Sequence, residues 1–153
     1  MLFHPNRAER LAAIADRLRT ADELTANLVT EVAAELCGRP PAYPQYVPPS
    51  ITFMINARAW IDAACAIAAH ALPQWKLRHL IYDEGRWHCS LSSMRDMPQW
   101  LDQPIETSHE ILPLALLAAI VDAARREHPI EDKPNVPQAR IQSGNLMSCD
   151  NFA

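Results

Sequence analysis

A cluster of cationic and aromatic side chains between residues 75 and 100 is the part of this sequence best equipped for chemistry. Guanidinium groups bind anions through charge-assisted hydrogen bonds, and indole rings stack on planar bases or on cations. The cluster therefore predicts a ligand site for an anion or a nucleotide base. The alternative, a solvated strand face backed by core tryptophans, is the simpler interpretation. The members of the cluster are Trp75, Arg78, Arg86, Trp87, His88, Arg95 and Trp100.

Histidine and cysteine are frequent enough, at six and four residues, to raise the question of a metal site. Zinc sites normally contain close-spaced pairs such as CxxC or HxxxH. Here the only adjacent pair is His88–Cys89, and neighbours on a strand point to opposite faces. A site gathered from His79, Cys89 and His109 is conceivable, but no spacing requires it. We therefore predict neither a metal nor a cofactor.

Nucleophilic catalysis would need a triad assembled from distant residues. Cys89 or Ser90 could combine with His109 and Asp102, but no nucleophile elbow surrounds either nucleophile. A packing role for Cys89 is the simpler interpretation. The chain thus predicts no catalytic residue, and a small Cys- or His-dependent hydrolase stays as an alternative.

Three carboxylates have positions that suggest structural roles rather than general acid–base catalysis. Asp62 lies in an apolar helical stretch, where it could pair with Arg58 four residues earlier. Glu106 and Glu110 are four residues apart and precede the last helical stretch, where acids complement the helix dipole.

The composition excludes several function classes. Three glycines cannot build a Gly-rich phosphate loop, and a net charge of −4 disfavours non-specific nucleic-acid binding. No apolar stretch is long enough to span a membrane. The cysteines form no CxxC pair and no secretory signal precedes them, which indicates reduced thiols in a cytoplasmic protein. Cys37 and Cys65 also fall in helical stretches that should be buried.

The strongest helical pattern covers residues 113–127, PLALLAAIVDAARRE. Pro113 suits the first turn, apolar residues recur at helical spacing, and cations gather at the end. Helices are also expected at 5–19 and 20–37, the second opened by a capping box of Thr20 and Glu23. We favour two separate helices over one bent helix. A further helix is expected at 57–72, capped by Asn56, with Trp60, Ala64, Ile67 and Ala71 as its buried stripe.

The β-prone stretches predict a small, mostly antiparallel sheet. A short strand is expected near 51–55, and residues 75–91 read as a hairpin whose turn is Asp83-Glu84-Gly85. Residues 92–106 would be an irregular connection or a third strand. Together these elements predict an α+β fold in a single domain, residues 1–128. Within it, residues 39–50 form a Pro-rich connector that should not be helical, and residues 129–153 form an irregular tail.

The order of these stretches resembles the small phage and prophage proteins grouped as the phage "ABA sandwich" domain. The resemblance covers about residues 50–127 and rests on SITFMINARAWIDAACAIAAHALPQWKL, WHCSLS and ETSHEILPLALLAAIVDAARRE. These stretches include an LPxW-type step (Leu72 to Trp75) and a terminal LALxxAxxxA helix (Leu114 to Ala123). The resemblance implies helices on both faces of a small antiparallel sheet, and it transfers no catalytic or binding residue.

These observations favour a non-enzymatic accessory protein of phage type that binds and inhibits or sequesters a host factor, such as an anti-defence protein. There are three alternatives: the hydrolase, a virion assembly protein, and a sponge for a small nucleotide signal. The sponge requires a concave basic pocket. A partner-binding inhibitor requires an exposed apolar patch. The Ala-rich helix and the apolar N-terminal helices favour a homodimer.

Overall fold

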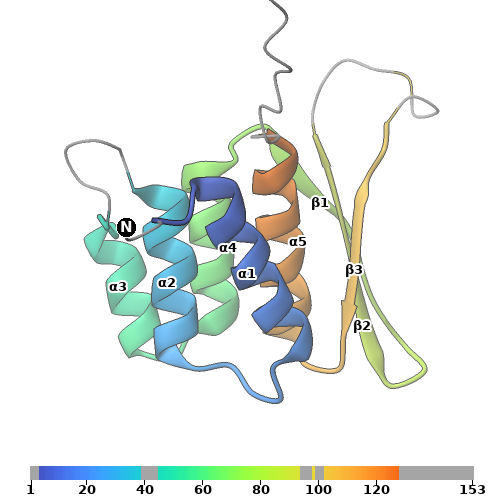
Figure 1. Ribbon diagram of the computed structural model, residues 1–153. Helices are drawn as coiled ribbons and strands as arrows, with labels where there is room; N and C mark the ends of the chain where they lie inside the picture. Colours follow the sequence, from blue (N-terminus) through green and yellow to red (C-terminus); the bar gives the residue numbers. More distant parts are fainter. Residues whose placement is uncertain (1–3, 39–44, 94–97, 99–101, 128–153) are drawn as a thin grey trace, which may run out of the picture.

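Along the described chain four helices are followed by three strands and a last helix, the order of an α+β protein, and the helices gather on one side of the sheet (Figure 1). The computed structural model describes residues 4–38, 45–93, 98 and 102–127. The predicted fold class is confirmed. The described elements are α1 (Arg7–Thr20), α2 (Ala26–Cys37), α3 (Pro49–Asn56), α4 (Trp60–Ala71), β1 (Trp75–Asp83), β2 (Arg86–Ser93), β3 (Ile105–His109) and α5 (Leu112–Glu127).

The sheet is an antiparallel meander in the order β1-β2-β3, and its register starts at the hairpin turn. Glu84 and Gly85 have φ values of 48° and 79°, so both lie in the left-handed region that a type I′ turn requires. The turn pairs Asp83 with Arg86, and the same register continues to the pair His79–Ser90. The predicted hairpin is confirmed.

A β-bulge between Leu77 and His79 interrupts the register of β1. The extra residue shifts the alternation of the strand by one position. Every second residue therefore faces one side of the sheet before the bulge and the other side after it. Trp75 and Leu77 share the helix-facing side, whereas His79 and Ile81 share the outer face with Ser90 and His88. In the sequence these four β1 residues occupy every second position, which would place them on one face of an unbroken strand, and the bulge prevents this.

Helix α5 is the centre of the core, as its sequence predicted. It packs on β2 and β3 on one side and on α1, α2 and α4 on the other. The hydroxyl of Thr107 in β3 donates a hydrogen bond to the Ala115 carbonyl of α5 at 2.7 Å. Its buried residues are Leu114, Ala115, Leu116, Leu117, Ala118, Ala119, Ile120, Val121, Ala123 and Ala124.

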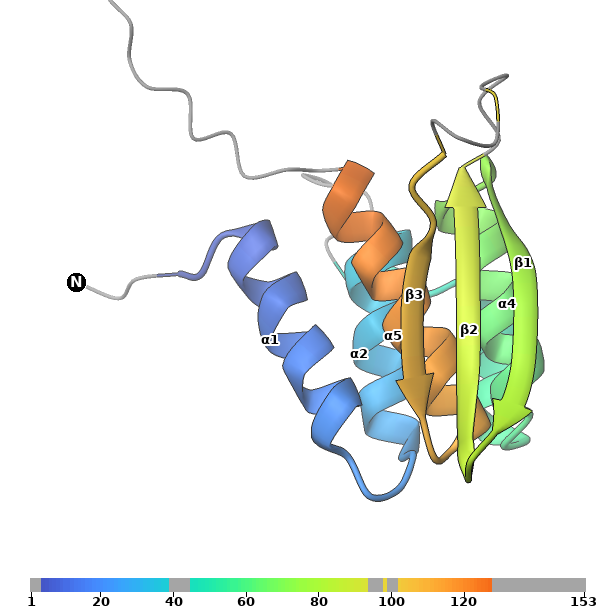
Figure 2. The same cartoon turned by 90° about the vertical axis from the view of Figure 1, so that its right-hand side faces the viewer.

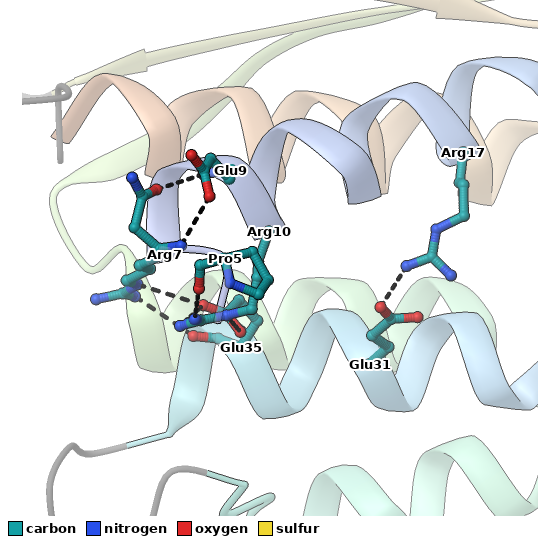
Figure 3. A network of polar contacts seen from close by, with 8 residues as sticks. Pro5, Arg7, Glu9, Arg10, Arg17, Glu31 and Glu35 are labelled. Carbon is teal, nitrogen blue, oxygen red and sulfur yellow. Dashed lines mark hydrogen bonds and ion pairs between the residues drawn. The ribbon is translucent and has the colours of Figure 1, made fainter. Parts of the chain in front are cut away.

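Helices α1 and α2 are held together at their polar surface by ion pairs, which Figure 3 shows. Arg10 makes two hydrogen bonds of 3.0 Å to the carboxylate of Glu35. This contact raises the pKa of the Arg10 guanidinium, because the neighbouring carboxylate stabilises its charged form. Further along α1, Arg17 forms an ion pair with Glu31 of α2. The two helices are thus separate antiparallel neighbours, as predicted.

The start of α1 is fixed by a reciprocal cap that the sequence analysis did not identify. The Asn6 side chain accepts from the Glu9 amide at 2.8 Å, and the Glu9 carboxylate accepts from the Asn6 amide at 2.9 Å. We expect Asn6→Ala to lower the free energy of unfolding by about 1 kcal/mol, because the Glu9 amide loses its acceptor. Urea denaturation followed by circular dichroism measures this change. Asn27→Ala, an exposed change inside α2, is the control and should be near neutral.

The strand predicted near residues 51–55 is wrong, because these residues belong to α3. Pro49 occupies the first turn, where its missing amide is tolerated, so the Pro-rich connector also ends earlier than predicted. Ile51 and Ile55, four residues apart, become buried on one face of this helix. That burial outweighs the local β-propensity of ITFMI.

Two predicted helix starts are also displaced. Helix α1 runs through Thr20, and α2 begins at Ala26 after the Thr25 side chain caps it, so no capping box forms at Thr20 and Glu23. Asn56 ends α3 instead of capping the next helix, and α4 begins at Trp60. Within α4, Ala64 and Ile67 are buried as predicted, and Trp60 and Ala71 are half-buried.

All described helices lie on one side of the sheet, and its other face is uncovered by any described helix (Figures 1 and 2). The family resemblance implied helices on both faces, and the described residues do not have that arrangement. No described helix is long and apolar enough to cross a membrane. The predicted tail, residues 129–153, and residues 39–44 of the connector lie outside the described residues.

Candidate functional site

The two described tryptophans of the predicted ligand cluster face the helices. Trp75 is buried near the start of β1, where its indole Nε1 donates to the Glu127 carboxylate at 2.9 Å and the Arg126 guanidinium lies 5.9 Å from its ring centroid. Trp87, near the hairpin turn, packs against Tyr82 with a ring-centroid distance of 5.0 Å. Both indoles therefore join the protein's own packing, at opposite ends of β1.

The two described arginines of the cluster already have partners within the protein. Arg78 reaches Ser92 at 3.5 Å and lies 3.7 Å from the Asp102 carboxylate. Arg86 donates to the Ser108 carbonyl at 3.2 Å and lies 3.8 Å from Glu110. His88 is exposed on the outer face of the sheet, and Arg95 and Trp100 lie outside the described residues. The described members thus do not converge on one site.

The residues considered for a triad or a metal are divided between the two faces of the sheet. Cys89 and His109 face the helices, whereas His79 and Ser90 face outward. The Nδ1 atom of His109 accepts a hydrogen bond from the Ile111 amide at 2.9 Å. Asp102 instead accepts a hydrogen bond from Ser92. Neither grouping is assembled, and no cluster of potential metal ligands occurs within the described residues.

The described thiols are unsuited to nucleophilic attack at neutral pH. Burial raises the pKa of Cys37 and of Cys89 to about 11, because desolvation disfavours the thiolate. Cys65 is exposed, which corrects its predicted burial, and its pKa is raised by partial desolvation and by the charge of Asp62. The protonated form of each of these three thiols is therefore favoured.

A trough of about 390 Å³ crosses the outer face of the sheet and draws on all three strands. The register aligns His79, Ser90 and Glu106 in one row across the sheet, and Ile81, His88 and Ser108 in the next. Residues directly opposite each other have Cβ atoms about 5 Å apart, so these six side chains form one surface. Among the described residues that line the trough, none is lysine or arginine.

A larger hollow of about 620 Å³ lies between α1, α5 and β3; Glu106 also lines it, and its arginines are paired within the protein. Asp122 pairs with Arg19 at 3.1 Å and with Arg125 at 3.3 Å. Arg126 donates to the Gln103 carbonyl. Arg19, Arg125 and Asp122 of the hollow therefore form an ion-paired seam between α1 and α5.

The sequence analysis missed the trough, although it named some of its members for other roles. Glu106 was expected at a helix start but lies in β3, and Ser90 was considered only as a nucleophile. The turn at Glu84 and Gly85 fixes the pairing of His79 with Ser90, so half of the trough was open to prediction. The position of β3 could not be predicted, because β3 is far from the hairpin along the chain and the sequence does not determine its register.

Comparison with models of protein families, with curated proteins and with solved structures finds no match for this chain.

Proposed function

We propose that this protein is a non-enzymatic binding protein that receives a basic side chain of a partner protein in the trough on its outer sheet face. The single observation that carries this proposal is the composition of that trough. A carboxylate (Glu106), an apolar wall (Ile81) and two serine hydroxyls lie together on a face that no described helix covers.

The lining matches a lysine or arginine side chain in both of its parts. Such a side chain has an aliphatic stem, which Ile81 can pack against, and a cationic end, which Glu106 can hold through charge-assisted hydrogen bonds. Ser90 and Ser108 add acceptors on either side. A net charge of −4 also favours encounter with a basic partner.

The same lining weighs against the nucleotide sponge. That alternative requires a concave basic pocket, whereas the described trough residues bear a carboxylate and no guanidinium or ammonium group. Among the described residues on which it depended, Trp75 is buried, and Arg78 and Arg86 are paired with acids and backbone groups. No specific observation favours a virion assembly role or a hydrolase.

The biological setting follows from the sequence resemblance. We place the protein among phage-type accessory proteins of the host cytoplasm, where it would inhibit or sequester a host factor, with an anti-defence role as one form of this. An exposed, preformed sheet face suits such a role, because a rigid surface loses little entropy on binding.

The test compares proteins captured from bacterial extract by the wild type and by matched variants. Glu106→Gln removes the negative charge of the carboxylate and keeps the shape of the side chain. Ser108→Arg fills the trough with a cation, which repels the cationic side chain of the partner. Glu110→Gln is the control, since Glu110 is an exposed carboxylate beyond the end of β3. Surface plasmon resonance with the captured partner then measures each affinity.

We expect Glu106→Gln to weaken binding about tenfold, since one charge-assisted hydrogen bond is lost. Ser108→Arg should abolish binding, and Glu110→Gln should leave it unchanged. A partner that binds all three variants equally would contradict the proposal, as would a partner whose essential contact residue is acidic.

A further inference from the structure

Strand β1 forms a free edge of the described sheet and concentrates exposed apolar side chains. It pairs with β2 on one side only (Figure 2). Leu77, Ile81 and Tyr82 are 46%, 55% and 59% exposed, and they make up half of the exposed large hydrophobic residues among the described ones. An exposed apolar edge strand is a template for pairing with another strand.

The two halves of β1 differ in their fitness for such pairing. The first half contains the bulge after Leu77 and the exposed cations Lys76 and Arg78, which are devices that block edge pairing. The second half, His79 to Asp83, is regular and pairs residue for residue with β2. Only this half presents an undistorted edge.

We propose that residues 79–83 pair antiparallel with the same residues of a second copy of this chain, with Ile81 at the twofold axis. The sequence of this half is self-complementary in that register. Ile81 faces its own copy, Leu80 faces Tyr82 of the second copy, and His79 faces Asp83 of the second copy. Both sheet faces keep their order, because each pair joins residues of the same face.

Charge complementarity selects this register and this occupant. Cations precede the apolar centre of β1 and acids follow it, so antiparallel self-pairing brings opposite charges together at both ends. The side chains of His79 and Asp83 make no hydrogen bond or ion pair with any described residue, which leaves both available. The result is a six-stranded sheet whose two troughs lie on one continuous face.

This inference shares His79 and Ile81 with the trough, but it does not rest on the proposed function. Glu106 and Ser108 lie on β3, at the opposite edge of the sheet, so Glu106→Gln should leave the dimer intact. The sequence analysis based a homodimer on the N-terminal and Ala-rich helices, and the sheet edge is a different surface.

Sedimentation equilibrium of the full chain tests the register by charge exchange. In His79→Asp two carboxylates face each other at two symmetric positions, and in Asp83→Lys an ammonium group replaces the carboxylate that faces each imidazole, so each change should weaken dimerisation about tenfold. An equimolar mixture of the two variants should form heterodimers of wild-type affinity, because every facing pair is again complementary. The two positions lie four residues apart in one chain, so this rescue can arise only between chains.

Disulfide cross-linking provides a second test. In a Cys65→Ser background, Ile81→Cys should form a covalent dimer on mild oxidation, since its thiols face each other across the axis. Leu77→Cys is the control, because Leu77 is similarly exposed and lies before the bulge. A wild type that is monomeric at high micromolar concentration would overturn the proposal. So would a dimer insensitive to both charge changes, or Leu77→Cys cross-linking as fast as Ile81→Cys.

Discussion

Replacing Leu117 by alanine should lower the free energy of unfolding by about 3 kcal/mol, because it leaves a cavity at the centre of the core. Leu117 is fully buried in α5, the helix that packs against both the sheet and the remaining helices. A loss of this size should lower the melting temperature by roughly 6 to 12 °C for a domain of this length. Differential scanning calorimetry and urea denaturation measure the two quantities.

The matched control is Leu117→Met, which keeps the volume of the side chain and should cost less than about 1.5 kcal/mol. If the alanine variant were no less stable than the methionine variant, Leu117 would not be enclosed, and the central position of α5 would be incorrect.

Enlarging Ala115 should also destabilise the protein, by about 2 kcal/mol for Ala115→Leu, but by overpacking instead of a cavity. Ala115 is fully buried where β3 approaches α5, and its carbonyl accepts the 2.7 Å hydrogen bond from Thr107. A larger side chain at this fully buried position must displace its neighbours, which should weaken that bond. Amide hydrogen exchange should therefore accelerate in β3 more than in α1.

Ala13→Leu provides the comparison, since Ala13 is exposed on α1 and its replacement should be near neutral. Equal destabilisation by the two leucine substitutions would indicate a general effect of added bulk. It would speak against a close contact between β3 and α5.

The parts of the fold that could be predicted are those whose signals are local. The helix around Leu114 to Ala124 combines strong propensity, a first-turn proline and a continuous apolar face, and all of these act in the same direction. The hairpin turn was predictable because Gly85 tolerates the positive φ that a tight turn requires.

The failures occurred where tertiary contacts outweigh local preference. The β-prone residues 51–55 form a helix because Ile51 and Ile55 can then be buried together. The bulge at Arg78 is not visible in the alternation of β1, and it changes which residues share a face. A site on a sheet depends on register, so the trough could not be derived from spacing along the chain alone.

The candidate ligand cluster illustrates the same limit. Nearness in sequence suggested that Trp75, Arg78, Trp87 and His88 would act together. The sheet places the indoles on the helix-facing side and His88 on the outer face, and the strand length separates Trp75 from Trp87. Strand β3, in contrast, brings Glu106 beside Ser90. These residues are 16 positions apart, and no sequence pattern indicates that they are neighbours.

The most direct test of the account is a selection of random peptides displayed on phage against the immobilised wild-type protein, counter-selected with Glu106→Gln. The account predicts enriched peptides with a lysine or arginine flanked by apolar residues, and loss of their binding to Ser108→Arg. Enrichment of acidic peptides, or of peptides that bind Glu106→Gln and the wild type equally, would contradict the claim that the outer sheet face is the binding site.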